Sequence, residues 1–559
     1  MPNPLTNQRT GGQILVDQLR IHGTDMAFGV PGESYLAVLD ALHDSPVRYI
    51  ICRQEGGAAI MAEAYGKLTG RPGVCMVTRG PGATNASAGV HIAAQDSSPM
   101  ILLIGQVARS MRGREAFQEI DYRQMFGGIA KWVTEIDDAS RIPELMARAY
   151  HTACSGRPGP VVVSLPEDML TDHATCQDAL RFQPVQAHPS VEDMARLQRL
   201  LSSARRPLAI LGGGGWNRQA VKDIKTFIER FNLPTAVSFR RQDYLDNTHP
   251  CYVGHAGVSL KPPLSDRIKD ADLLILIGTR LGEASSMGYE VIDIPTPKQT
   301  LVHVHADAEE LGVTYAPDLS INAGVGPFAR ASLRLKPINH ERWADITTAA
   351  RQDYLDGMKP REFEGRMNFA KAVAYLNEHL PEDAIITNGA GNYSVWVSNF
   401  YQYKGFGTQL APISGSMGYG TPAAIAAKLA HPHRTVIAFA GDGCFLMTGQ
   451  EMATAAQYDL KVIWIIANNG TYGTIRMHQE RDYPKRVSGT DLANPDFAEL
   501  ARAYGGYGEV VETDDDFPAA LERAMAADSF ALLDVRLDSE VITPSVTIEE
   551  LRSGTKLRR

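Results

Sequence analysis

The sequence predicts an α/β protein made of three open, doubly wound domains with parallel strands. Short apolar runs rich in Val and Ile recur along the chain and end in Gly or Asp, and amphipathic segments follow them. Continuous apolar strands of this kind belong to parallel sheets that helices cover on both faces. Two polar stretches divide the 559 residues into three blocks of ordinary domain size.

The expected strands are spread over the whole chain. We expect them in GVCMVTRG (73–80), PMILLIGQ (99–106), GPVVVSLP (159–166), PLAILGGGG (207–215), ADLLILIGTR (271–280), QTLVHVHAD (299–307), RTVIAFAGDG (434–443), KVIWIIANNG (461–470) and ALLDVRL (531–537). The polar stretches run from Gln177 to Ser190 and from about Arg334 to Asn368, and the second carries a helix. The domains are therefore expected at 1–178, 190–335 and 365–545.

Composition narrows the class of protein. Hydrophobic residues make up 44% and charged residues 21% of the chain, so we expect a large packed core. The net charge of -9 does not indicate the positively charged surface that nucleic-acid-binding proteins carry. No apolar run is long enough to span a bilayer, and MPNPLTNQRTGGQ lacks the apolar core of a signal peptide. The six scattered cysteines form no C-x-x-C pair. We expect a cytoplasmic protein with reduced thiols and no nucleic-acid or membrane partner.

The third block contains a predicted metal site. One strand runs into Gly441-Asp442-Gly443, and the next ends in Asn468-Asn469-Gly470, with Asn469 placed 27 positions after Asp442. Each motif alone is explained by an ordinary turn. Together they place polar residues past the carboxyl ends of two strands, where α/β sheets bind ligands. Mg²⁺ prefers oxygen donors, which Asp442, the Asn469 amide and the Thr471 carbonyl supply. Gly443 leaves room for a diphosphate group.

The GDG motif followed about 27 residues later by NN resembles the signature of thiamine-diphosphate enzymes. The order of the blocks is similar to the branch that contains acetolactate synthase, pyruvate decarboxylase, pyruvate oxidase, benzaldehyde lyase and benzoylformate decarboxylase, and most similar to the acetolactate synthase large subunit. The resemblance implies a pyrimidine-binding domain, a central domain and a diphosphate-binding domain in that order. It implies thiamine diphosphate and Mg²⁺ as cofactors, and a homodimer or homotetramer whose active sites lie between subunits.

The resemblance assigns a role to Glu55, which ends the expected strand VRYIICRQE. A buried carboxylate there would hydrogen-bond the cofactor's aminopyrimidine and stabilise the imino tautomer that generates the ylid. Taken alone, Glu55 indicates only a solvated strand end. The Met417 side chain would wedge between the cofactor rings, although a methionine usually fills a core. The positions implied to bind the cofactor are Glu55, Gly391, Asn392, Gly415, Met417, Gly441, Asp442, Gly443, Cys444, Asn469, Thr471, Tyr472, Gly473 and Thr474.

Two of the candidate substrate positions differ from those of acetolactate synthases, and two are identical. Glu33 stands where acetolactate synthases carry a small glycine, and it is either a second acid–base group or a surface carboxylate. Arg79 replaces a small residue before Gly80, and it either binds a substrate carboxylate or forms a structural salt bridge. Phe117 and Gln118 lie in the stretch AFQE, which is identical to a substrate-channel segment of acetolactate synthases.

Two further positions bear on the acceptor pocket. His478 replaces a tryptophan that restricts this pocket in biosynthetic acetolactate synthases, and Ile475 keeps the nearby hydrophobic position. His478 is a titratable group in the pocket or an exposed helix residue. Thr78 stands where benzoylformate decarboxylase has a catalytic histidine, which argues against that activity.

FAD stays open as a third cofactor. Arg157 and Arg280 match positions that bind FAD in some relatives, whereas the stretches RRQDYLD and YVGHAG depart from the usual flavin contacts. The run Gly212–Gly215 is weak evidence for a dinucleotide.

The resemblance implies a carboligase, classed as a transferase or a lyase. A pyruvate-like 2-oxo acid would lose CO₂, and the resulting enamine would add to an aldehyde or ketone acceptor. The alternatives are protonation of the enamine, as in a non-ligating decarboxylase, and its oxidation by a flavin. A catalytically silent binding protein on the same fold would be expected to lack Glu55 or the metal ligands, and all of them are present.

Overall fold

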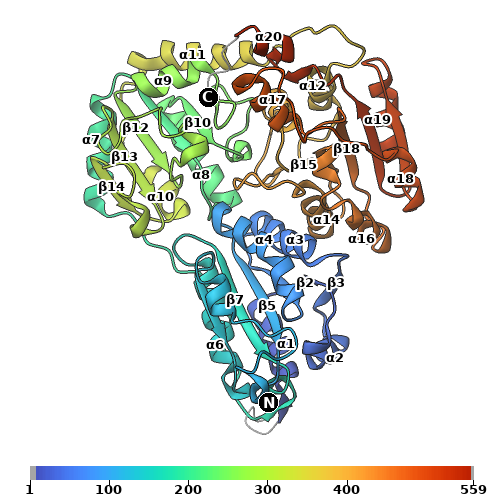
Figure 1. Ribbon diagram of the computed structural model, residues 1–559. Helices are drawn as coiled ribbons and strands as arrows, with labels where there is room; N and C mark the ends of the chain where they lie inside the picture. Colours follow the sequence, from blue (N-terminus) through green and yellow to red (C-terminus); the bar gives the residue numbers. More distant parts are fainter. Residues whose placement is uncertain (1–7, 555–559) are drawn as a thin grey trace. The chain divides into compact units, whose positions relative to one another are not determined.

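The computed structural model describes residues 8–554 and confirms the α/β class. The chain forms two compact units, Met1–Val185 and Gln186–Arg559. The first unit contains one six-stranded parallel sheet and the second contains two (Figure 1). All nine expected apolar runs form strands of these sheets. Within residues 8–554, no helix is long and apolar enough to cross a bilayer.

The sheet of the first unit has the order β3-β2-β4-β5-β7-β6. Its strands are β2 (Met26–Gly29), β3 (Arg48–Ile51), β4 (Gly73–Val77), β5 (Met100–Gln106), β6 (Trp132–Glu135) and β7 (Pro160–Pro166), and β1 (Arg9–Thr10) pairs with β8 (His173–Ala174). The helices are α1 (Gly11–His22), α2 (Leu36–His43), α3 (Glu55–Thr69), α4 (Pro81–Asp96), α5 (Tyr122–Phe126) and α6 (Ile142–Cys154). Every residue of β5 and β7 is buried, as expected for inner strands of a covered parallel sheet.

Helices α3 and α4 cross at a point where only a very small residue fits. A Cβ atom added to Gly89 of α4 would lie 2.4 Å from the Ala59 Cβ and 2.7 Å from the Ala59 carbonyl carbon on α3. This close approach fixes the position of α4 relative to α3, the helix that begins with Glu55.

We expect Gly89→Ala to destabilise the first unit. The added methyl group must displace backbone, and overpacking of this kind costs about 1–3 kcal/mol, which exceeds the roughly 1 kcal/mol that alanine gains over glycine in a helix. The measurement is a denaturant titration followed by fluorescence. Gly128→Ala is the control, because no atom lies within 4 Å of its added Cβ. Equal stability of both variants would contradict the prediction.

The second sheet has the order β11-β10-β9-β12-β13-β14. Its strands are β9 (Pro207–Leu211), β10 (Thr235–Ser238), β11 (Tyr252–Ala256), β12 (Leu273–Ile277), β13 (Thr300–His305) and β14 (Leu319–Asn322). Helices α7 (Val191–Ser203), α8 (Arg218–Phe231), α9 (Pro262–Asp270), α10 (Val325–Ser332) and α11 (Ala344–Gly357) accompany it.

The two polar stretches differ in structure. Residues 175–190 form no helix or strand. In the second stretch, Trp343 is fully buried in the core of the second sheet, and its Nε1 donates to the carbonyls of Phe231 and Asn232 at 3.1 Å each. Trp343 directly precedes α11. This part of the second polar stretch therefore packs against the second sheet and is not a free linker.

The third sheet has the order β16-β15-β17-β18-β20-β19. Its strands are β15 (Ile385–Asn388), β16 (Gln409–Leu410), β17 (Val436–Gly441), β18 (Ile463–Asn468), β19 (Tyr507–Val511) and β20 (Ala531–Arg536), and β21 (Val541–Thr543) pairs with β22 (Val546–Thr547). The helices are α12 (Phe369–His379), α13 (Tyr393–Phe400), α14 (Gly420–Ala430), α15 (Asp442–Phe445), α16 (Met452–Gln457), α17 (Gly473–Asp482), α18 (Phe497–Ala503), α19 (Asp516–Ala526) and α20 (Ile548–Arg552).

The segment that follows β17 is not one continuous helix. It is divided into α15, a 3₁₀ turn at Gly449–Glu451 and α16. At the break, Thr448 donates its backbone N–H to the Phe445 carbonyl and its hydroxyl to the Gly418 carbonyl, at 2.7 Å for the hydroxyl. The Thr448 side chain thus attaches the break to the segment before α14.

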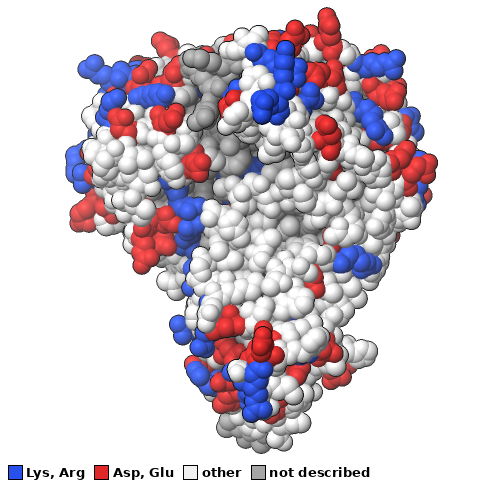
Figure 2. Space-filling model, in the orientation of Figure 1, with Lys and Arg blue, Asp and Glu red and all other residues white. Residues whose placement is uncertain are grey.

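In Figure 2, charged residues of both signs gather in parts of the visible face of each unit, and other parts of that face carry few charges.

Candidate active site

Glu55 is the first residue of α3 and does not end a strand as the sequence suggested. Strand β3 ends at Ile51, and Gln54 caps the helix by accepting a hydrogen bond from the Gly57 N–H at 3.1 Å. The N-terminal end of a helix favours a carboxylate because the unpaired N–H groups carry partial positive charge. Glu55 is half-buried in the single chain, whereas the sequence suggested a buried residue.

The Glu55 carboxylate is held between α3 and α4. Asn85 Nδ2 donates to Glu55 Oε2 at 3.0 Å. A Cβ atom on Gly82 would lie 3.5 Å from Glu55 Oε1, so a small residue keeps this side of the carboxylate accessible. Burial raises the pKa of the nearby Cys75 thiol, and the charge of Glu55 raises it further. Asn85 had no role in the sequence prediction, because the residue that orients Glu55 lies 30 positions further along the chain.

Asp442 follows β17 directly and begins α15, as predicted. Its Oδ1 accepts from the Gly443 N–H at 2.8 Å, and its Oδ2 accepts from the Gly470 N–H and from Asn494 Nδ2, each at 2.8 Å. The side chain is buried, and this burial raises its pKa. Its hydrogen-bond partners are all neutral, so a bound cation would offset the cost of burying the carboxylate.

The turn after β18 supplies the other oxygen donors. Asn469 Oδ1 accepts from the Thr471 N–H at 3.3 Å, and Thr471 donates its hydroxyl to the Thr490 carbonyl at 3.0 Å. Within residues 8–554, no group of three or more His, Cys, Asp or Glu side chains could hold a metal. The candidate set at Asp442 instead combines one carboxylate with neutral amide and carbonyl oxygens, which fits Mg²⁺.

Sequence reasoning missed a second layer of residues behind Asp442. Asn494 Nδ2 contacts Asn468 Oδ1 at 3.2 Å as well as Asp442. Asn468 Nδ2 in turn donates to Asp534 Oδ1 at 2.9 Å, and Asp534 is fully buried. Asn494 lies 52 residues after Asp442 in a loop, where no periodic pattern marks it. Such partners orient metal-binding side chains.

The loop that contains Gly391 and Asn392 lies beside the start of α17. Thr474 Oγ1 donates to Asn392 Oδ1 at 2.9 Å, and Asn392 Nδ2 donates to the Ile542 carbonyl at 2.9 Å. Gly391 has a φ of +139°, a conformation that L-residues rarely adopt. These contacts fix the loop before α13 against the segment that begins at Gly473.

Cys444 links the predicted cofactor segment to α15 through its buried sulfur. Its Sγ accepts from the Gly418 N–H at 3.2 Å and lies 3.3 Å from the Tyr393 hydroxyl oxygen. Burial raises the pKa of the thiol. Met417 is half-buried and packs against the core of the third sheet, and the Cβ direction of Gly415 is open. The segment is thereby held at Gly418 and open at Gly415.

Three other predicted positions are confined by their neighbours. A Cβ atom on Gly443 would lie 2.4 Å from the ring of Tyr472, and one on Gly441 would lie 3.1 Å from the ring of Tyr393. A Cβ atom on Gly473 would lie 3.2 Å from Asn469 Nδ2. The structure therefore brings together, in the second unit, every predicted cofactor position except Glu55, which belongs to the first unit.

Arg79 is buried between two carboxylates. Its Nη2 contacts Glu33 Oε1 at 2.6 Å and its Nη1 contacts Glu167 Oε2 at 2.7 Å. The Glu33 side chain is 68% exposed. This geometry favours the structural salt bridge over a free guanidinium that would bind substrate, and it places Glu33 under the influence of Arg79.

We expect Arg79→Met to lower the free energy of unfolding by about 1–3 kcal/mol, since hydrogen bonds to charged groups contribute this much. Chemical denaturation of the protein measures the change. Arg141→Met is the control, because Arg141 pairs with Glu144 at an exposed i,i+3 position and should change stability by less than about 0.5 kcal/mol. A large rise in KM with unchanged stability would instead support substrate binding by Arg79.

The remaining substrate candidates lie at the surface of the single chain. Phe117 is 74% exposed and Ile475 is 53% exposed. Gln118 has a φ of +66°, and its carbonyl oxygen would lie 2.8 Å from a Cβ atom on Gly80, so this loop packs against the turn that follows Arg79. His478 is exposed on α17. Ile475 and His478 belong to the second unit, whereas Phe117 and Gln118 belong to the first.

The two arginines that suggested FAD differ in position. Arg157 belongs to the first unit, where its Nε donates to Ser97 Oγ at 2.9 Å and its Nη2 donates to the Ala94 carbonyl at 2.7 Å. Arg157 therefore caps the C-terminal end of α4. Arg280 follows β12 in the second unit.

Comparison with protein families gives three matches along the chain. The N-terminal TPP binding domain of thiamine pyrophosphate enzymes matches residues 9–125, their central domain matches residues 194–332 and their C-terminal TPP binding domain matches residues 389–535. Thiamine pyrophosphate is the same compound as thiamine diphosphate.

Curated relatives align over nearly the whole chain. Acetolactate synthase isozyme 2 large subunit of Escherichia coli (strain K12) is 30% identical over 94% of this chain and 95% of its own length. Acetolactate synthase of Mycobacterium bovis is 32% identical over 93% and 86%, and the acetolactate synthase large subunit of Lactococcus lactis subsp. lactis is 32% identical over 90% and 88%.

The three matched domains define a thiamine-diphosphate-dependent enzyme. Within that class, the chain belongs to the acetolactate-synthase-like family.

Proposed function

We propose that this enzyme removes CO₂ from a pyruvate-like 2-oxo acid. It then joins the fragment that remains to the carbonyl carbon of a second compound. The observation that carries the proposal is the alignment with acetolactate synthase large subunits over at least 90% of the chain. The site residues of both units are compatible with this activity.

The oxygen donors that follow β17 and β18 support thiamine diphosphate and Mg²⁺ as cofactors. Thiamine diphosphate, when bound, supplies a nucleophilic carbon and an electron sink for the carbanion left by decarboxylation. We propose that Asp442, Asn469 and the Thr471 carbonyl hold Mg²⁺ for the diphosphate. Gly391, Asn392 and Thr474 would contact the diphosphate end, and Gly415 and Met417 would contact the ring end. The proposed reaction transfers no electrons to an external acceptor, and FAD stays open as a third cofactor.

Glu55 is proposed to control the proton at the aminopyrimidine. Asn85 donates to one of its oxygens at 3.0 Å, which leaves Oε1 to receive or hold a proton. Because the carboxylate begins a helix, its orientation is fixed by the backbone of α3 and by Asn85. Glu33, held by Arg79, is proposed to face the substrate rather than the cofactor.

Glu55 and Asp442 lie in different units of the chain. We propose that they meet in a homodimer or homotetramer, with each active site formed between subunits. The proposed domains are 1–178, 190–335 and 365–545, and the proposed compartment is the cytoplasm.

The test is a product analysis with purified protein, thiamine diphosphate and Mg²⁺. A panel of 2-oxo acids is supplied with and without an aldehyde acceptor, and products are identified by mass spectrometry. Acetolactate or acetoin from pyruvate is the expected result. Acetaldehyde alone would indicate a non-ligating decarboxylase and acetate an oxidase, and either would overturn the carboligase proposal. Failure of every 2-oxo acid would overturn the donor assignment.

A further inference from the structure

A buried stretch of the central domain is hydrogen-bonded to the C-terminal TPP binding domain. It comprises residues 240–246 (RRQDYLD), which lie just after β10 and include no residue of the candidate active site. Gln242 Nε2 donates to the Ser398 carbonyl on α13 at 2.9 Å. Asp243 Oδ2 accepts from the Gly407 N–H at 2.9 Å. The side chains of this stretch are therefore engaged with the neighbouring domain of the same unit.

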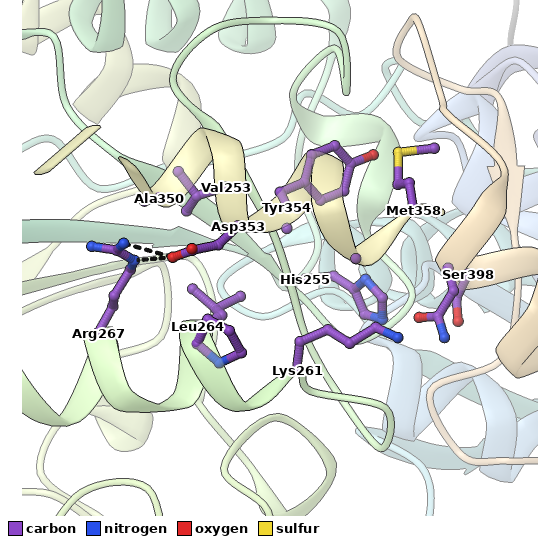
Figure 3. Close-up of a pocket in the computed structure, with 14 residues that line it drawn as sticks. Val253, His255, Lys261, Leu264, Arg267, Ala350, Asp353, Tyr354, Met358 and Ser398 are labelled. Atoms are coloured by element: carbon purple, nitrogen blue, oxygen red, sulfur yellow. Dashed lines mark hydrogen bonds and ion pairs between the residues drawn. The ribbon is translucent and has the colours of Figure 1, made fainter. Parts of the chain in front are cut away.

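Helix α13 contacts the central domain near both of its ends. Near its C-terminal end, Ser398 lines the same small pocket as His255 of β11 (Figure 3). Near its N-terminal end, the Ser394 hydroxyl accepts a hydrogen bond from Arg240. The helix begins two residues after Gly391. The central domain thus holds the helix that carries the Gly391 loop.

The guanidinium of Arg240 joins the two segments that carry proposed cofactor contacts. Its Nη1 donates to the Pro412 carbonyl, and the same carbonyl accepts from the Gly415 N–H at 3.1 Å. Its Nη2 donates to Ser394 Oγ at 3.4 Å, and this hydroxyl donates to the Gly391 carbonyl at 2.8 Å. One planar group therefore connects the turn that ends at Gly415 with the loop at Gly391.

The backbone of Arg240 adopts a conformation that side chains rarely take. Its φ is +58°, in the left-handed region, which costs an L-residue about 1–2 kcal/mol. The residue is only 7% exposed, and its guanidinium carbon lies 4.8 Å from the centre of the Phe239 ring. Strain of this kind persists only where the surrounding contacts hold it, and it gathers at functional sites. The two hydrogen-bonded arms of the guanidinium are contacts of that kind.

The charge of Arg240 also acts on buried groups beside the candidate site. Burial raises the pKa of the Tyr393 hydroxyl and of the Cys444 thiol, and the charge of Arg240 opposes both rises. Cys444 Sγ accepts from the Gly418 N–H at 3.2 Å, so this charge acts near the segment that contains Gly415. An arginine stays protonated at every pH at which enzymes work, and the charge is therefore constant.

We propose that Arg240 is a positioning residue for thiamine diphosphate and acts from the central domain. Its guanidinium sets the spacing between the Gly391 loop and the Gly415 turn, which are proposed to contact opposite ends of the cofactor. A planar fork suits this task because its nitrogens donate to two acceptors in a fixed geometry. This role rests on the cofactor contacts proposed above for Gly391 and Gly415.

The test compares Arg240→Met with Arg241→Met. Arg241 is the matched control, because it is the next residue and is only 2% exposed, but its Nε donates to the Gly213 carbonyl at 3.0 Å within the central domain. Fluorescence titration of the cofactor-free protein with thiamine diphosphate, in excess Mg²⁺, gives the Kd of each variant. Denaturant titration gives its stability, and circular dichroism verifies that it is folded.

We expect both variants to lose stability, but only Arg240→Met to lose affinity for thiamine diphosphate, by about 10- to 100-fold. Arg240→Lys keeps the charge without the two-armed fork, so its affinity should lie between those of Arg240→Met and the unmodified protein. Arg241→Met should bind the cofactor as the unmodified protein does.

Unchanged affinity in Arg240→Met, or equal losses of affinity in Arg240→Met and Arg241→Met, would overturn the role of Arg240 alone. If Arg240→Met does not fold, Arg240→Lys provides the second measurement, and unchanged affinity in that variant would overturn the role equally. Absence of thiamine diphosphate binding by the unmodified protein would overturn this role together with the cofactor contacts on which it rests.

Discussion

Glu55→Gln should lower kcat by about 10² to 10⁴ while the protein still binds thiamine diphosphate. The amide keeps the size of the carboxylate and can still accept the hydrogen bond from Asn85 Nδ2, which lies 3.0 Å from Oε2. It cannot exchange the proton that Oε1 is proposed to hold, and proton transfer by a positioned group contributes about this factor. Turnover of the active 2-oxo acid and a fluorescence titration of the cofactor are measured on the same preparation.

Glu144→Gln is the matched control for this variant. Glu144 also lies in the first turn of a helix, α6, but it is exposed and pairs with Arg141. We expect its turnover to equal that of the unmodified enzyme. If Glu55→Gln retained full turnover, the proposed role of Glu55 would be refuted. Loss of cofactor binding together with turnover would show that Glu55 positions the cofactor and would leave no separate role in proton control.

The fold was predictable because each buried parallel strand can be recognised from its own short run of apolar residues. Runs such as VIAFA and VIWIIA are buried over their whole length, so their apolar composition alone identifies them. The break between α15 and α16 was not predictable, because it depends on the Thr448 hydroxyl reaching the Gly418 carbonyl, 30 residues away. The sequence analysis placed Glu55 at the end of a strand, although it begins α3. The start of this helix was hard to predict because glutamine is an unusual residue at a helix N-cap.

Some residues of the candidate site could also be predicted from the sequence, and others could not. Asp442 and Asn469 were found because each follows a strand end, and strand ends meet at one edge of a sheet. Asn85 and Asn494 were missed because they act through side chains on a neighbouring helix or loop and carry no spacing rule. The salt bridges of Arg79 to Glu33 and Glu167 could not be read from the sequence either, because Glu167 lies 88 positions away.

Asp442→Asn should weaken the binding of Mg²⁺ and thiamine diphosphate by at least about 100-fold. The carboxylate accepts from three donors, at Gly443, Gly470 and Asn494. An amide offers one acceptor oxygen and turns its own N–H₂ group toward a donor, so the variant should also lose about 1–3 kcal/mol of stability without cofactor. Calorimetric titration of Mg²⁺ with thiamine diphosphate, and denaturation of the cofactor-free protein, measure the two effects.

Asp534→Asn separates these effects, because Asp534 is also a buried carboxylate but is not a proposed metal ligand, and its Oδ2 pairs with Arg536 Nη2 at 2.7 Å. It is a buried carboxylate whose pKa burial raises, and it accepts from Asn468 Nδ2 at 2.9 Å. We expect a comparable loss of stability and a much smaller loss of affinity, since Asp534 acts on the metal only through Asn468 and Asn494. Equal losses of affinity in the two variants would contradict direct coordination by Asp442, because the whole effect would then arise from disturbing the buried hydrogen-bond network.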